Sequence, residues 1–300
     1  MNKHIFLDTM TASLGSLVAG KKKFFVKSIQ SSSFEEHIAA TQIDCPQITG
    51  EGIFEIKAKT LVGELNPALG IAKWIGFDCP TIIYHHGNNE RPFDYTNFAK
   101  NSFYKILAKH KLQIQANLLV VRAPFHNCKL SFYQEKMTEL ANFVAMISTS
   151  VKFNETIVQY MQSKSKAPVI TAGISLGGWT TNIHRGIFNS SSAYIPFMAG
   201  TLLGDLFLNS KYRKLTSDIA LQNPEQIKSI LNFDKYFVTI KNKNLFPLLG
   251  RYDQFIEYNF QKESYNGHPL KTIDYGHITG SLQTKTLKNH ILDVLNTLQT

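Results

Sequence analysis

The stretch Gly173-Ile174-Ser175-Leu176-Gly177 has the residue types and spacing that most directly suggest chemistry. A G-x-S-x-G pattern after a short apolar run is typical of a nucleophile elbow, where a strand turns sharply into a helix with the serine at the apex. The turn crowds the positions two before and two after the serine, and glycine has no Cβ to clash there. The following helix directs its first N–H groups and positive dipole end toward the serine. The pattern predicts a nucleophilic Ser175.

The elements that must position this serine are short apolar strands alternating with amphipathic helices. Strands are predicted at 24–29, 52–58, 80–84, 115–121, directly before Gly173, and at 192–197, 245–249 and 270–274. Helices are predicted at 4–18, 95–110, 131–147, after 154, at 177–188, in pieces between 200 and 236, and at 282–298. This alternation predicts an α/β fold: a mostly parallel central sheet flanked by helices on both faces.

Three more polar groups follow predicted strands in the same way as Ser175. Asp253 comes after the strand 245–249, His277 after the strand 270–274, and the His86-Gly87 turn after the strand 80–84. In open parallel sheets, sites lie beyond the carboxyl ends of the strands. We therefore expect these four groups to meet at one edge of the sheet.

With this order of serine, acid and histidine, the chain resembles an α/β-hydrolase. The resemblance covers about residues 50–300 and rests on the elbow, Gly276-His277 and Gly250-x-x-Asp253. It identifies no subfamily. It implies an α/β-hydrolase core over 51–199 and 241–300, an N-terminal strap and early strand over 1–50, and a small helical cap inserted at 200–240, before the acid-bearing strand.

The resemblance also implies a role for each residue. His277 would take the proton of Ser175 and later protonate the leaving group, and Asp253 would fix the imidazole tautomer. The oxyanion donors would be the backbone N–H of Leu176 and that of Gly87 or Asn88, because the family often carries His-Gly in that loop. The rivals to these residues are His268, in a turn at the wrong end of the sheet, and Asp205, Asp234 and Asp274.

The substrate pocket is expected between the loop at 85–95 and the cap at 200–240. Leu203 and Phe207 would line an acyl pocket, or would only pack the cap on the core. Glu90 would bind a substrate amine, or would be an ordinary salt-bridged loop residue. Trp179 is interpreted as a core residue.

The chemistry that these residues imply is cleavage of a carboxylic ester by a serine hydrolase through an acyl-enzyme. A thioesterase, a lipase or a peptidase would use the same residues, and an acyltransferase would pass the acyl group to an alcohol. From another class, a non-catalytic ligand-binding protein on the same fold stays open. A serine at the elbow, in place of an aspartate, argues against dehalogenase and epoxide-hydrolase chemistry.

No metal or organic cofactor is expected. His85, His86 and His126 suggest a metal site, but no carboxylate or cysteine spacing completes one, so we expect them to support the oxyanion loop. Cys45, Cys79 and Cys128 do not form a disulfide framework or a zinc pattern.

The resemblance implies a small-molecule acyl substrate as the partner. The net charge is +10, from 27 Lys and 5 Arg against 22 acidic residues, and the lysines are scattered. We expect no nucleic-acid binding, because no basic motif or aromatic-interleaved patch supports it. The sequence contains no run of 18 apolar residues, so no integral membrane segment is expected. The first 20 residues resemble a helix or strap more than a signal peptide, so a cytoplasmic location is expected; the oligomeric state stays open.

Overall fold

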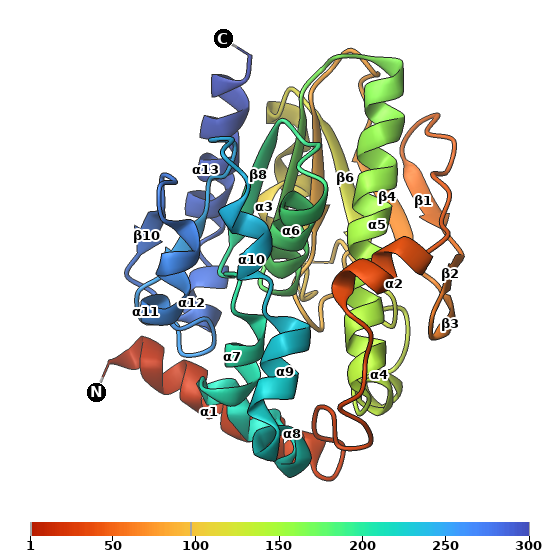
Figure 1. Cartoon of the computed structure of the whole chain (residues 1–300). Helices are drawn as coiled ribbons and strands as arrows, with labels where there is room; N and C mark the ends of the chain where they lie inside the picture. Colours follow the sequence, from red (N-terminus) through yellow and green to blue (C-terminus); the bar gives the residue numbers. More distant parts are fainter. Residues whose placement is uncertain (1, 97, 300) are drawn as a thin grey trace.

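The computed structural model describes residues 2–96 and 98–299, and an eight-stranded sheet runs through its centre (Figure 1). The strand order is β1-β4-β6-β5-β7-β8-β9-β10. All strands from β6 to β10 run parallel, whereas β1 and β4 are antiparallel to their neighbours. The bounds are β1 Gly52–Glu55, β4 Ala68–Lys73, β5 Thr81–His85, β6 Asn117–Arg122, β7 Val169–Ile174, β8 Ala193–Phe197, β9 Leu248–Gly250 and β10 Lys271–Ile273. The prediction of a mostly parallel sheet is confirmed.

The central strands are hydrophobic throughout because both faces of the sheet are covered. Every residue of β5, β6, β7 and β8 is buried. Such continuous apolar runs are expected of parallel strands between two helix layers. The edge strand β1 is mostly exposed. A separate two-stranded ribbon is formed by β2 Ala58–Thr60 and β3 Gly63–Leu65.

Helices form a layer on each face of the sheet (Figure 1). On one face, α3 Ser102–Ile106 and α13 Thr284–Thr297 pack on β5, β7 and β8. The opposite layer includes α5 Leu140–Lys164 and α6 Leu176–Ile187, with α2 Phe34–Ala40 against α5. Outside these layers lie α1 Lys3–Ala19, α4 Leu130–Lys136, α11 Tyr258–Gln261 and α12 His277–Ser281, together with the helices between β8 and β9. Within the described ranges, no helix is long and apolar enough to cross a membrane.

The segment between β8 and β9 is helical, as predicted for 200–240. It contains α7 Leu203–Leu208, a 3-10 helix over Lys211–Leu215, α8 Asp218–Gln222, α9 Pro224–Leu231 and α10 Asp234–Val238. The helices α7, α8 and α9 lie below the carboxyl end of the sheet in Figure 1, near α1, whereas α10 lies beside α6.

The predicted strand at 24–29 is wrong. The stretch makes only two isolated bridges, from Phe24 to Thr216 and from Ser28 to Glu139. Phe25 has a φ of 66°, which no regular strand contains, and its side chain is fully buried among other aromatic rings. The apolar character of the stretch therefore reflects burial of its side chains and not pairing in the sheet.

Two predicted helices also have other bounds. The helix at 131–147 is broken between α4 and α5, because the amides of Lys27 and Leu140 bond across the chain to Thr138 and Ser28 carbonyls. Beyond the break, α5 continues without interruption to Lys164. The helix at 95–110 is reduced to α3 and a 3-10 helix over Ala108–Gln113; position 97 lies outside the described residues.

Candidate active site

Ser175 lies at the apex of the turn between β7 and α6, with φ 52° and ψ −111°. This is a backbone conformation that non-glycine residues adopt only under strain, and such strain clusters at functional sites. The turn requires glycine at positions 173 and 177, because no side chain fits there. A Cβ at Gly173 would lie 2.4 Å from the Gly177 carbonyl oxygen, and one at Gly177 would lie 2.0 Å from the His85 carbonyl oxygen. The local geometry is therefore that of the elbow which the sequence predicts.

Ser175, His277 and Asp253 form a continuous hydrogen-bonded chain. His277, the first residue of α12, lies with Nε2 3.0 Å from Ser175 Oγ and Nδ1 2.7 Å from Asp253 Oδ2. The histidine is 9% exposed and the aspartate 2%. With the proton on Nδ1, the ring donates to Asp253 and leaves Nε2 free to accept the serine proton.

Asp253 is held in place by its own loop. Its Oδ1 accepts hydrogen bonds from the backbone amides of Phe255 at 2.8 Å and Ile256 at 2.7 Å. The rival acids lie elsewhere: Asp274 is largely exposed and pairs with Arg251, and Asp205 bonds within the 200–240 segment. Of the four candidate acids, Asp253 is the one in hydrogen-bond contact with His277.

Opposing effects act on the pKa of His277. Burial lowers it, whereas the charge and hydrogen bond of Asp253, with a further contribution from the charge of Asp8, raise it. The net direction is upward from the ordinary value. The carboxylates thus stabilise the imidazolium that forms when His277 accepts a proton.

Two backbone amides near Ser175 are available to an oxyanion. Within residues 2–96 and 98–299, the N–H groups of Leu176 and Asn88 donate no hydrogen bond. The Gly87 amide lies beside the Glu90 carboxylate and favours its charged form. The Asn88 side chain is oriented by Tyr212, whose hydroxyl accepts from Nδ2 at 3.4 Å, and by His126 Nε2, 3.3 Å from Oδ1. Asn88, more than Gly87, therefore suits the second donor position.

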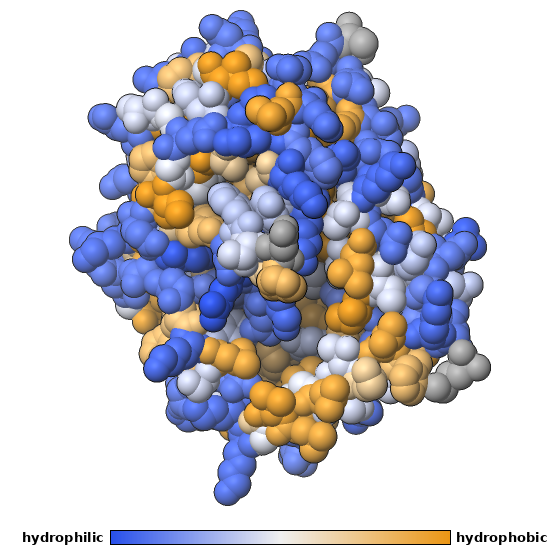
Figure 2. All heavy atoms as spheres, turned by 180° about the vertical axis from the view of Figure 1, so that it is seen from behind, coloured by the Kyte–Doolittle hydropathy of each residue, from blue (hydrophilic) through white to orange (hydrophobic). Residues whose placement is uncertain are grey.

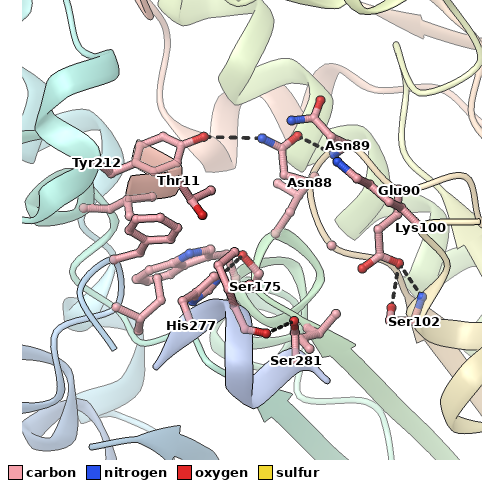
Figure 3. Close-up of a pocket in the computed structure, with 18 of the residues that line it drawn as sticks. Thr11, Asn88, Asn89, Glu90, Lys100, Ser102, Ser175, Tyr212, His277 and Ser281 are labelled. Atoms are coloured by element: carbon pink, nitrogen blue, oxygen red, sulfur yellow. Dashed lines mark hydrogen bonds between the residues drawn. The ribbon is translucent and has the colours of Figure 1, made fainter. Parts of the chain in front are cut away.

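Ser175 and His277 open into a cavity of about 510 Å³. Its apolar side is formed from several elements of the chain and contains Leu203 and Phe207, both expected from the sequence, with Phe24, Phe143, Trp179, Leu206, Phe255 and Ile256. Its polar side carries the loop after β5. Figure 3 shows Ser175 and His277 between Tyr212 and Thr11 on one side and Asn88, Asn89, Glu90, Lys100 and Ser102 on the other.

Glu90 lines this polar side, but its carboxylate already has partners. Its Oε2 accepts from the backbone amide of Ser102 at 2.8 Å and from the Ser102 hydroxyl at 2.6 Å. Burial raises its pKa, and the hydrogen bonds to Ser102 and Gly87 only partly oppose this. These contacts tie the loop after β5 to the start of α3.

The histidines beside the oxyanion loop are buried and take part in its structure. His86 Nε2 accepts from the Ala123 amide at 3.0 Å, and Nδ1 lies 2.7 Å from the Gly87 carbonyl oxygen, so the neutral ring is the form that fits. Its ring stacks on His85 and contacts His126 edge-on. No group of three His, Cys, Asp or Glu suited to a metal ion occurs among the described residues.

Several residues of the site were not predicted from the sequence. Thr11, Phe24, Tyr212 and Phe255 line the cavity, and Asp8 bonds to the backbone of the loops that carry Asp253 and His277. Trp179, predicted to be core, is 2% exposed and also lines the cavity. For Asp8, the sequence offers one signal, a charge that interrupts an apolar helix pattern.

The fold is the α/β-hydrolase fold, as comparison with solved structures shows. Est1E from Butyrivibrio proteoclasticus superposes with a TM-score of 0.53 at 14% identity, over 83% of this chain and 100% of that one. Acetyl xylan esterase 1 from a Thermoanaerobacterium species superposes with a TM-score of 0.56 at 14% identity, over 86% and 90% of the two chains.

A longer protein also contains this fold. Pyrococcus horikoshii acylaminoacyl peptidase superposes with a TM-score of 0.54 at 13% identity, over 82% of this chain and 41% of that one. No protein-family model matches the sequence, and no curated protein is significantly similar to it.

Proposed function

We propose that this chain is a serine hydrolase that cleaves a carboxylic ester through an acyl-enzyme on Ser175. The observation that carries the proposal is the hydrogen-bonded chain from Ser175 Oγ through His277 to Asp253, at 3.0 and 2.7 Å. A serine hydroxyl becomes a competent nucleophile when such a base accepts its proton. The fold shared with esterases and a peptidase supports the same reaction class.

In the acylation half, Ser175 Oγ attacks the ester carbonyl carbon while His277 Nε2 takes the hydroxyl proton. The carbonyl electron pair moves onto oxygen, where the amides of Leu176 and Asn88 donate hydrogen bonds to it. Asp253 stabilises the imidazolium and does not itself take the proton. The tetrahedral intermediate then collapses, the carbon–oxygen bond to the alcohol breaks, and His277 gives its proton to the departing oxygen.

In the deacylation half, water replaces the alcohol. His277 takes a proton from the water as its oxygen attacks the acyl carbon, and the second intermediate forms in the same oxyanion site. Its collapse breaks the bond to Ser175 Oγ, which recovers its proton from His277 and releases the carboxylic acid. No redox or metal step is needed to balance either half.

The cavity supports a small acyl substrate. We infer that the acyl chain occupies the apolar side, where the 200–240 segment serves as a cap through Leu203 and Phe207. The alcohol would then face Asn89 and Lys100. An ester is favoured over a peptide with a free amino terminus because the Glu90 carboxylate is already bonded to Ser102, and burial raises its pKa. A carboxylate in that state is a poor partner for an ammonium group.

The test is covalent labelling by a fluorophosphonate probe, with Ser175→Ala as control and circular dichroism to establish that both proteins are folded. We expect labelling of the wild type alone. No labelling of folded wild-type protein would overturn the proposal in favour of a ligand-binding protein on this fold.

A substrate panel then distinguishes the reactions that share this triad. Aryl esters of increasing acyl length are compared with thioesters and aminoacyl amides, and products are analysed with and without added alcohols. We expect the highest kcat/KM for esters. A preference for thioesters or amides, or transfer to the alcohol in place of water, would assign the triad to a thioesterase, a peptidase or an acyltransferase.

A further inference from the structure

The N-terminal helix α1 is docked with its polar side inward. Its buried positions are His4, Asp8, Ala12 and Ala19. Its large apolar side chains point to solvent: Phe6, Met10, Leu14, Leu17 and Val18 are 41–78% exposed. An ordinary surface helix buries its apolar stripe. Figure 2 views the side opposite to Figure 1 and shows apolar side chains gathered along its lower edge, the level at which α1 lies in Figure 1. Polar contacts must therefore contribute much of what fixes α1.

The Asp8 carboxylate is the centre of these contacts. It is 0% exposed. Its Oδ2 accepts from the backbone amides of His277 at 2.7 Å and Gln254 at 3.1 Å, and its Oδ1 accepts from the Ile278 amide at 3.0 Å. One side chain thus bonds to the residue after the candidate acid and to the candidate base itself.

The surroundings of Asp8 leave it little freedom. A Cβ at Gly276 would lie 2.7 Å from Asp8 Oδ2, so the approach requires glycine directly before His277. One turn earlier in α1, His4 Nδ1 lies 2.8 Å from Thr279 Oγ1 in α12, and the His4 ring stacks on Tyr252. His4 therefore contacts the same two segments of the chain that Asp8 contacts.

We propose that Asp8 is a positioning residue for the triad: its carboxylate clamps the Asp253 loop and the His277 turn together, so that α1 completes the active site. This inference rests on the proposed function, since it assigns Asp8 to the same reaction. Burial raises the pKa of Asp8, whereas the hydrogen bonds from the amides of Ile278 and His277 act to lower it. A buried carboxylate held at such a cost indicates a constraint that an apolar residue would not meet.

Asp8 also acts on His277 through its charge. The charges that raise the pKa of His277 are those of Asp253 and Asp8, against burial, which lowers it. Asp253 in turn acts on Glu257, and His4 is the neighbouring titratable group on α1. Removing the Asp8 charge should therefore lower the pKa of His277, although Asp253 keeps its own charge.

The experiment compares Asp8→Asn with Asp218→Asn, which removes an exposed carboxylate from α8. An amide can accept hydrogen bonds with one oxygen only. Asp8→Asn therefore loses some of the hydrogen bonds of the clamp, while the side chain keeps its size. Asp8→Glu serves as the conservative variant and as the substitute if Asp8→Asn does not fold. Three quantities are measured: kcat and KM on an aryl ester, the pH dependence of kcat/KM, and amide hydrogen exchange at Gln254, His277 and Ile278.

For Asp8→Asn we expect kcat to fall by up to about 100-fold, the size of effect that misplacement of a reacting group causes. KM should stay within about twofold, because Asp8 is not part of the cavity lining. The acidic limb of kcat/KM should move to lower pH, and exchange should accelerate at the three amides. Asp8→Glu keeps the charge, so the acidic limb of its kcat/KM profile should stay at nearly the same pH as in the wild type, although its kcat falls. Asp218→Asn should match the wild type in every measurement.

The inference would be overturned if folded Asp8→Asn had the same kcat, the same acidic limb of kcat/KM and the same amide exchange rates as the wild type. A loss of activity that the fraction of folded protein fully explains would also overturn it, because that result would make Asp8 only an anchor for α1. If the wild type hydrolyses no ester, the proposed function fails, and amide exchange with the NMR titration of His277 still decides whether Asp8 clamps the two loops.

Discussion

At the scale of single residues, burial and nearby charges act in opposite directions on the pKa of His277. Burial lowers its pKa, and the charge and hydrogen bond of the Asp253 carboxylate, 2.7 Å from Nδ1, together with the charge of Asp8, raise it by more. The neutral ring is the form that takes the Ser175 proton. Activity in the proposed reaction should therefore rise with pH through a pKa above the ordinary value of about 6.5.

Asp253→Asn should change this profile in two ways. Removal of the charge lowers the pKa of His277, so the acidic limb of kcat/KM moves to lower pH. The amide also favours the wrong imidazole tautomer, so kcat should fall by up to about 10⁴-fold. The measurement is a pH–rate profile on an aryl ester. Asp274→Asn is the control, because Asp274 is exposed and pairs with Arg251; loss of turnover in the control and not in Asp253→Asn would show that the acid is misassigned.

At the scale of elements, the elbow depends on the absence of a side chain at Gly177. A Cβ there would lie 2.0 Å from the His85 carbonyl oxygen at the end of β5, so α6 and β5 would have to separate. Gly177→Ala should lower the thermal midpoint by an amount equivalent to about 1–3 kcal/mol and greatly reduce labelling of Ser175. Gly50→Ala, where nothing lies within 4 Å, should change neither. Equal midpoints for the two variants would contradict the steric argument.

The helix α7 offers a matched test of the acyl pocket. Leu203 and Leu208 are both buried in α7, at 0% and 5% exposure, but only Leu203 lines the cavity. Each substitution to alanine should cost about 2–5 kcal/mol of stability. Leu203→Ala should also shift the preferred ester toward longer acyl chains, whereas Leu208→Ala should not. The readouts are urea denaturation and kcat/KM across acyl lengths; an identical chain-length profile in both variants would exclude Leu203 from the acyl pocket.

Which elements the sequence predicts depends on where their side chains pack. The strands β5 to β8 are identified well because each is a short apolar run between polar turns, and burial on both faces requires that composition. Phe24 and Phe25 give the same signal, yet they pack in an aromatic cluster outside the sheet. The strand β4, Ala-Leu-Gly-Ile-Ala-Lys, was missed because its small residues and glycine do not resemble a strand. Local composition indicates that a segment is buried. Whether that segment becomes a strand of the sheet depends on its pairing in the tertiary structure.

At the scale of the whole molecule, Ser175, Asp253 and His277 meet because parallel strands bring their carboxyl ends to one edge. That rule is general, so the sequence predicted which groups would be neighbours. The clamp at Asp8 follows no such rule: it joins residues 269 positions apart through a helix that docks by its polar side. Likewise, the choice of Asn88 over Gly87 as free donor depends on the contact of Glu90 with Gly87, which spacing alone does not reveal.

Buried histidines couple the stability of the whole molecule to pH. Burial lowers the pKa of His85 to about 3 and that of His126 to about 4, and lowers that of His86 strongly. The geometry agrees for His86, whose Nε2 accepts the Ala123 amide and cannot do so when protonated. For His85, Nε2 is buried and has no hydrogen-bond partner among the described residues, so a proton there would be an unsatisfied donor. The folded protein thus keeps these rings neutral where the unfolded chain protonates them.

The free energy of unfolding should therefore decrease as pH falls below about 6.5. In that range these histidines bind protons in the unfolded chain but stay neutral in the folded chain. Each such histidine contributes a slope of up to about 1.4 kcal/mol per pH unit down to its folded-state pKa. The measurement is urea denaturation between pH 7 and pH 5. His85→Asn, whose amide can still donate to the His86 carbonyl oxygen in place of Nδ1, should flatten the dependence. His110→Gln, at a half-exposed position, should flatten it much less; equal slopes in the two variants would show that the buried histidines are not its source.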